Sequence, residues 1–248
     1  MTGLLVLAAG ALALWLLSLR WRDASIVDIA WAPAFAAMAW LATPWPPTVR
    51  GMAVLALASL WGVRLGLHIA LRHNGEDRRY AAMRAKHGAR WWWWSVFQVF
   101  ALQAVLVWAI SWPLRAAVAA PAPWGVLDGI GVALAAGGLL FEAVADWQLR
   151  RFRADPGNRG RVMDRGLWHW SRHPNYFGDA LMWWGFFVVA LAGTGAWWLA
   201  VSPIAMTVLL LRVSGVTLME EDIGGRRTDY ADYIKRTSAF VPWPPARI

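Results

Sequence analysis

The chain has 248 residues, of which 59% are hydrophobic and 16% are charged, and its formal net charge is +9 at pH 7. This composition excludes an ordinary water-soluble domain and indicates a polytopic membrane protein. The absence of cysteine excludes disulfides and thiolate chemistry, and the five histidines form no tight ligand cluster, so we expect no metal site.

Seven apolar segments have the length of roughly 17 to 25 residues that a helix needs to cross a bilayer. We therefore expect an all-α membrane bundle of about seven transmembrane helices in a single domain, at residues 1–19, 24–43, 51–71, 91–112, 125–147, 177–196 and 198–218. The first segment lacks the basic start and the cleavage site of a signal peptide, so we expect it to be a retained helix.

The basic residues predict the orientation of these helices. They cluster just after the first segment, within 72–90, within 150–172 and in the tail, whereas the alternate loops hold only Arg50, only Arg115 and none. Because cytoplasmic loops carry the positive excess, we expect the amino terminus outside and the carboxyl terminus in the cytoplasm. This arrangement explains most of the net charge and favours contact with anionic lipids over nucleic-acid binding.

Ionisable residues inside the predicted spans are a stronger functional signal. Each costs about 2.5 to 3.5 kcal/mol on insertion scales unless it faces a partner or a cavity. Seven residues meet this description: Asp28, Arg64, His68, Glu142, Asp146, Asp179 and Arg212. Structural pairing, for example of Asp28 with Arg64, is one explanation, and a functional polar site is the other.

A polar stripe is predicted at the cytoplasmic end of segment 125–147. Glu142, Asp146, Arg150 and Arg153 recur at spacings of four, four and three residues, so they share a helical face that we expect to point into the bundle. The basic loop that follows is rich in turn-forming residues. Its cations either set the topology or hold the phosphates of a dinucleotide.

The sixth segment begins with a second polar stripe. Asn175, Asp179 and Trp183 repeat every four residues, and Arg172 comes just before Pro174, a residue suited to the first turn of a helix. A helix start with free backbone N–H groups and an adjacent arginine can cradle a phosphate.

The carboxyl-terminal region carries three further candidate residues. Arg212 falls within the last predicted span, and Tyr230 and Tyr233 share one face of a short amphipathic segment that follows a Gly-Gly break. The two tyrosines either cover a cofactor from the cytoplasmic side or pack the tail on the membrane interface.

Four sequence motifs resemble a known family. They are DASIVDIAW, WGVRLGLHIALRHNGEDRRY, FEAVADWQLRRFR and GLWHWSRHPNYFGDALMWWG, followed by the tail with its two tyrosines. Together they are similar to the bacterial membrane proteins related to steroid 5α-reductase, in the branch that carries a domain-of-unknown-function label. The shorter RHP.Y.G element is less specific, because it also occurs in isoprenylcysteine carboxyl methyltransferases.

The resemblance implies a seven-helix enzyme of the bacterial inner membrane that uses NADPH to reduce an activated carbon–carbon double bond in a lipid-like substrate. It implies that substrate-side helices lie within 1–120 and that cofactor-binding helices, loop and tail lie within 121–248. Matched by motif, the residues implied to contact the cofactor are Asp146, Arg150, Arg153, Asn175, Asp179, Trp183 and Arg212. Arg172, Tyr230 and Tyr233 complete the expected cofactor site.

The substrate half of the resemblance departs from the reductases. Steroid reductases polarise the substrate carbonyl with a Gln-Glu pair and a tyrosine, but this chain has no Gln-Glu dipeptide, and Trp61 stands nearest to the tyrosine position. Asp28, His68 and Tyr80 are the candidates for the catalytic acid. A steroid, an isoprenoid and a fatty enone therefore all stay open as substrates.

Two other functions stay open. The RHPNYFG element and the acidic pair Glu220 and Glu221 favour an S-adenosylmethionine-dependent membrane methyltransferase. The basic residues near Asp146 argue against it, because a cofactor without phosphates needs fewer cations. The third possibility is a non-catalytic role in lipid binding or assembly.

Overall fold

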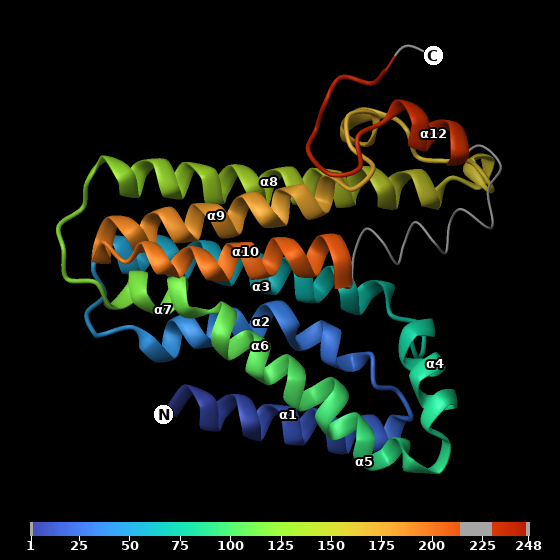
Figure 1. The fold of residues 1–248 in the computed structure, drawn as a ribbon, viewed down its shortest axis with the longest axis horizontal. Coiled ribbons are helices and arrows are strands. Elements are labelled where there is room, and N and C mark those ends of the chain that lie inside the picture. Colours follow the sequence, from blue (N-terminus) through green and yellow to red (C-terminus); the bar gives the residue numbers. More distant parts are fainter. Residues whose placement is uncertain (1, 214–229, 247–248) are drawn as a thin grey trace. The chain divides into compact units, whose positions relative to one another are not determined.

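The computed structural model describes residues 2–213 and 230–246, and the described part is all-helical. Five of its helices are long and apolar enough to cross a membrane, so the protein is a membrane protein. Figure 1 shows the helices along the chain, which divides into two compact units: unit 1 comprises 1–124 with 190–196, and unit 2 comprises 125–189 with 197–248.

Unit 1 is built from helices joined by short turns. In chain order they are α1 (Thr2–Trp21), α2 (Ile26–Ala42), α3 (Val49–Arg72), α4 (Arg78–His87), η1 (Gly88–Arg90), α5 (Trp91–Ser95), η2 (Val96–Ala101), α6 (Leu102–Ile110) and α7 (Trp112–Ala119). Thr48 caps α3, because its side chain accepts a hydrogen bond from the backbone N–H of Gly51 at 3.1 Å. The predicted span 91–112 is the second part of a helical run from Arg78 to Ile110.

Helices α2 and α3 pack closely because two glycines of α3 have no side chain. A Cβ at Gly62 would lie 3.1 Å from the carbonyl oxygen of Ala32, and a Cβ at Gly66 would lie 3.1 Å from that of Ile29. Trp61 is fully buried beside Phe35, with ring centroids 5.8 Å apart. Trp61 therefore fills the core of unit 1.

Arg50 has a structural role in unit 1. Its side chain is buried, with 1% of the residue exposed, and its guanidinium donates to the carbonyl oxygens of Ala122 at 2.7 Å and Pro123 at 3.0 Å. It thereby ties down the backbone just after α7 and gives the buried guanidinium hydrogen-bond acceptors. This explains a lone arginine at the start of α3, in a region with few other positive charges.

Unit 2 begins with α8 (Val126–Ala154), a helix of 29 residues. The other elements are η3 (Pro156–Asn158), η4 (Gly166–His169), α9 (Pro174–Thr194), η5 (Trp197–Ala200), α10 (Val201–Val208), η6 (Leu209–Val213) and α12 (Tyr230–Arg236). Helix α8 continues seven residues beyond the end of the predicted span at 147, so Arg150 and Arg153 lie on the helix, as their spacing indicates. Pro156 then ends the helix.

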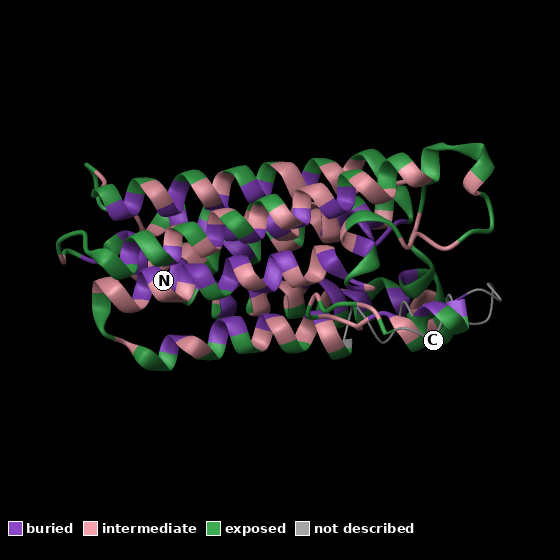
Figure 2. Ribbon diagram, turned by 90° about the horizontal axis from the view of Figure 1, so that it is seen from above, coloured by how far each residue is buried: buried purple, intermediate pink, exposed green. Residues whose placement is uncertain are grey.

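Antiparallel packing of α8 on α9 depends on four glycines, spaced seven residues apart on each helix: Gly131 and Gly138, and Gly178 and Gly185. A Cβ at Gly138 would lie 2.5 Å from the carbonyl oxygen of Gly178, and a Cβ at Gly178 would lie 2.5 Å from the backbone nitrogen of Glu142. Buried positions recur along one side of the long helices (Figure 2). Glycine at these positions lets the two backbones touch.

Candidate functional site

The two predicted polar stripes of unit 2 meet where α8 packs on α9. The side-chain Nδ2 of Asn175 donates to Oδ1 of Asp146 at 3.1 Å. Glu142 and Asp146 are buried, with 4% and 5% of each residue exposed, and Asp179 and Trp183 are buried as well. The helical spacing therefore placed these residues correctly on the inward faces of their helices.

Asn175 has one polar atom whose hydrogen-bonding capacity is unused. Its Oδ1 is buried, and it has no hydrogen-bond partner among residues 2–213 and 230–246. A buried acceptor in this state costs about 1–3 kcal/mol unless a ligand or water supplies a donor. The atom therefore marks a place where a donor from a ligand would be favourable.

The predicted arginines occupy different environments. Arg150 and Arg153 lie one and two turns beyond Asp146, and both are exposed. This last part of α8 extends beyond the region where the helix packs on α9. Arg172 is half-buried and donates from Nη1 to the carbonyl oxygen of Ile234 at 2.9 Å. Arg212 is exposed on η6. Arg150 and Arg153 thus present cations next to the buried acidic stripe.

The tail from 230 to 246 packs on the segment that precedes α9. The hydroxyl of Tyr233 donates to the carbonyl oxygen of Trp168, and the backbone N–H of Arg172 donates to the carbonyl oxygen of Ser238 at 2.8 Å. Burial raises the pKa of the Tyr233 hydroxyl, and the nearby Tyr230 and Asp164 raise it further. Tyr233 is therefore a neutral donor that anchors the tail, and its contact with a cofactor stays a prediction.

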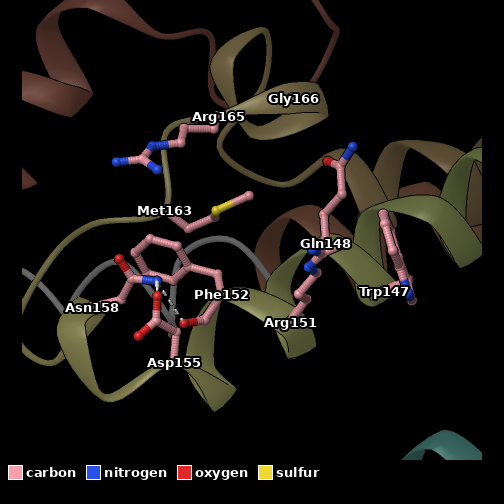
Figure 3. Close-up of a pocket in the computed structure, with 9 residues that line it drawn as sticks. All are labelled: Trp147, Gln148, Arg151, Phe152, Asp155, Asn158, Met163, Arg165 and Gly166. Atoms are coloured by element: carbon pink, nitrogen blue, oxygen red, sulfur yellow. Dashed lines mark hydrogen bonds between the residues drawn. The ribbon is translucent and has the colours of Figure 1, made fainter.

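A cavity of about 360 Å³ lies beside the end of α8 (Figure 3). Its lining residues include Trp147, Arg151, Phe152 and Asp155 of the helix end and Met163 and Arg165 of the loop. At 100° per residue, Trp147 and Arg151 face away from Asp146. Sequence reasoning missed this cavity, because it depends on where the loop folds back.

In unit 1, two of the three predicted catalytic residues come together. The hydroxyl of Tyr80 donates to Oδ1 of Asp28 at 2.7 Å, and Nε2 of Gln103 donates to the hydroxyl oxygen of Tyr80 at 3.1 Å. Asp28 also forms an ion pair with Arg79 at 3.1 Å, because α4 places Arg79 and Tyr80 on the same side as the start of α2. The suggested pairing of Asp28 with Arg64 stays a prediction.

Gln103 is the residue of this cluster that sequence reasoning missed. It was visible as an amide side chain inside the apolar run 91–112, where a polar group needs a partner. His68, the third predicted catalytic residue, lies half-buried on α3 with its ring 3.5 Å from Arg72. Its catalytic role stays a prediction.

A second network joins the α1–α2 turn to the α3–α4 loop. His73 contacts Asp23 at 2.7 Å, the backbone N–H of Ala24 donates to Glu76 at 2.9 Å, and Arg84 pairs with Glu76 at 2.8 Å. Burial raises the pKa of the Asp77 carboxyl, but hydrogen bonds from Arg79 outweigh this effect and hold the pKa below its usual range. These contacts fix the start of α4 and thus the position of Tyr80.

Some predictions lie outside the described residues. Glu220 and Glu221, on which the methyltransferase alternative depends, belong to this group, as do Arg226 and Arg227 of the basic tail.

Comparison with known proteins identifies the family. Neither the curated proteins nor the solved structures yield a match. The model of one family, described as protein of unknown function (DUF1295), matches residues 14–237. This agrees with the motif resemblance at the level of a domain-of-unknown-function family. The match covers both helical units, and the chain belongs to the DUF1295 family.

Proposed function

We propose that this protein is an NADPH-dependent reductase of an activated carbon–carbon double bond in a lipid-like substrate. In this proposal the chain crosses the inner membrane seven times, with its amino terminus outside and its carboxyl terminus in the cytoplasm. The observation that carries the proposal is the contact of buried Asp146 with half-buried Asn175, in which the buried Oδ1 of Asn175 has no partner among the described residues.

The residues around this pair suit a dinucleotide. Asn175 Oδ1 would accept a hydrogen bond from a ribose hydroxyl or from the carboxamide N–H of the nicotinamide, both of which are donors. Arg150 and Arg153, exposed beyond Asp146, would hold phosphate oxygens, which arginine binds through paired N–H groups. NADPH, when bound, supplies the hydride.

The cluster in unit 1 suits the other half of the reaction, in which a carbonyl must be polarised. Tyr80 keeps its proton, donates to Asp28 and accepts from Gln103, so its hydroxyl is held in one orientation. The amide N–H from Gln103 also makes the tyrosine a better donor, since hydrogen bonds in a chain polarise one another. A substrate carbonyl that takes the place of Asp28 as acceptor would be stabilised as charge develops on its oxygen.

The first test is cofactor binding by the full chain purified in detergent. NADPH and S-adenosylmethionine are titrated in parallel while the midpoint of thermal unfolding is followed. A ligand that binds only the folded state stabilises it by about 2.7 kcal/mol at a hundred times its Kd. We expect NADPH to raise the midpoint and S-adenosylmethionine to leave it unchanged. Stabilisation by S-adenosylmethionine alone would contradict the reductase function and favour a methyltransferase.

A second test concerns Tyr80. With an enone that the wild type reduces, Tyr80→Phe is expected to lower kcat by about 10²- to 10⁴-fold, because the donor to the carbonyl is lost. The Kd for NADPH is expected to stay the same, since Tyr80 lies in unit 1 and the proposed cofactor residues in unit 2. The rate of NADPH oxidation gives kcat, and thermal titration with NADPH gives the Kd. A variant with unchanged kcat would restrict Tyr80 to a structural role.

A further inference from the structure

The cavity beside the end of α8 is not used by the proposed reductase. By the helical period of 100° per residue, its lining residues on α8 face away from Asp146. Its arginines, Arg151 and Arg165 (Figure 3), are different from those assigned to the cofactor. Neither guanidinium makes a hydrogen bond or an ion pair with any residue that the structure describes. Two arginines without carboxylate partners at one cavity favour an anionic ligand.

The carboxylate at the cavity does not neutralise these arginines. Oδ1 of Asp155 accepts from the backbone N–H of Gly157 at 2.9 Å, and its Oδ2 accepts from Asn158 at 3.3 Å. Both oxygens thus serve the turn that ends α8. Arg151 instead lies over the ring of Trp147, with its Cζ 5.6 Å from the ring centroid. Trp147 orients the cation and leaves its N–H groups available.

The apolar part of the cavity indicates a ligand with a hydrophobic portion. Phe152 and Met163 line the cavity together with the two arginines. Inorganic phosphate has no apolar part that could pack on such a surface. A phospholipid does, in its glycerol backbone and upper acyl chains.

An exposed apolar stripe of α8 leads from the cavity along the helix. Its members share one face, at spacings of three, four and seven residues, and all are exposed: Val126, Ile130, Ala133, Gly137, Leu140 and Trp147. Leu140 is 65% exposed and Trp147 49% exposed. From Val126 to Trp147 the stripe is about 32 Å long at 1.5 Å per residue. This length matches the hydrocarbon core of a bilayer, about 30 Å, and Trp147 stands at the end where aromatic belts lie.

We propose that the cavity formed by Trp147, Arg151, Phe152, Met163 and Arg165 binds the headgroup phosphate of an anionic phospholipid, whose acyl chains lie along the exposed stripe of α8. The two guanidinium groups hold the phosphate, and Trp147 lies at the junction of headgroup and chains. The site is separate from the proposed NADPH site and needs no catalysis. With the carboxyl terminus in the cytoplasm, it faces the leaflet whose surface is negatively charged.

The test uses the full chain in detergent and three probes: short-chain phosphatidylglycerol, the matching phosphatidylcholine, and inorganic phosphate. Native mass spectrometry measures bound lipid, and thermal unfolding measures stabilisation. We expect phosphatidylglycerol to bind at least about tenfold more tightly than phosphatidylcholine, because a zwitterionic headgroup offers the arginines less charge. Equal binding of both lipids, or no lipid binding, would overturn the proposal. Stabilisation by inorganic phosphate equal to that by phosphatidylglycerol would assign the cavity to a soluble anion instead.

Matched variants locate the site. Arg151→Gln with Arg165→Gln is expected to weaken phosphatidylglycerol binding by about tenfold or more. The control, Arg159→Gln with Arg90→Gln, removes the same charge from exposed positions outside the cavity and is expected to bind as the wild type does. Equal weakening in both double variants would reduce the effect to net charge and overturn the site.

NADPH titration of the same variants separates this proposal from the proposed function. The Arg151 and Arg165 double variant is expected to keep the NADPH affinity of the wild type. If it instead loses NADPH affinity and keeps phosphatidylglycerol binding, the cavity belongs to the cofactor. If the wild type binds phosphatidylglycerol but not NADPH, the lipid site is supported and the proposed reductase function is rejected.

Discussion

Gly138→Ala is expected to destabilise the protein by about 3 kcal/mol, the upper end of the usual cost of overpacking, although it adds a single methyl group. The added Cβ would lie 2.5 Å from the carbonyl oxygen of Gly178 and still closer to the backbone nitrogen of Met182. Backbone atoms cannot rotate away as a side chain does, so α8 and α9 must separate. Separation would also break the contact between Asp146 and Asn175, and NADPH stabilisation is expected to disappear with it.

The neighbouring glycine is a matched control. Gly137 is exposed on the same helix, and a Cβ there meets nothing within 4 Å. Gly137→Ala is therefore expected to stabilise the helix by about 0.5–1 kcal/mol, because alanine loses less conformational entropy than glycine. Denaturant unfolding in detergent, followed by circular dichroism, measures both variants. Equal stability of the two would mean that α8 and α9 do not touch at Gly138.

Asn175→Ala is expected to weaken NADPH binding by about 100-fold while leaving the protein folded. The substitution removes both the acceptor Oδ1 and the donor that orients Asp146. The fold should survive, because the glycine contacts between α8 and α9 do not involve the asparagine side chain. Thermal titration with NADPH measures the affinity, and the unfolding midpoint without ligand reports the fold.

An exposed asparagine serves as the control for this second prediction. Asn74 lies in the loop between α3 and α4, in unit 1, and Asn74→Ala is expected to bind NADPH as the wild type does. Asp179→Ala, one turn beyond Asn175, should lose binding in the same way. Normal NADPH binding by both the Asn175 and the Asp179 variants would remove these residues from the cofactor site.

Local patterns predicted the parts of the site that lie on one helix. The spacing of Glu142 and Asp146 placed both on the inward face of α8, where they are buried. Pro174 was expected in the first turn of a helix, and α9 begins there. Such predictions succeed because the period of 3.6 residues relates side chains that are close in sequence. The same periodicity could not show that Arg150 and Arg153 leave the packed region and become exposed.

Contacts between distant residues were beyond local patterns. The hydrogen bond from Tyr80 to Asp28 joins residues 52 positions apart, and Gln103 is a further 23 positions from Tyr80. Their meeting depends on the turn and capping contacts that fix α4, among them those of Asp77 and Glu76. None of these contacts has a periodic signature, so the ion pair of Asp28 with Arg79 could not be predicted from the sequence.

The sequence alone determined that the protein is an all-helical membrane protein and which side chains share each helical face, because composition and helical period are properties of neighbouring residues. The tertiary structure decided which faces meet. Glycines on both helices let α8 approach α9 and bring Asp146 to Asn175, and the loop after α8 folds back to place Arg165 beside the same cavity as Arg151. These pairings depend on close packing and loop geometry, which act between residues far apart in the chain.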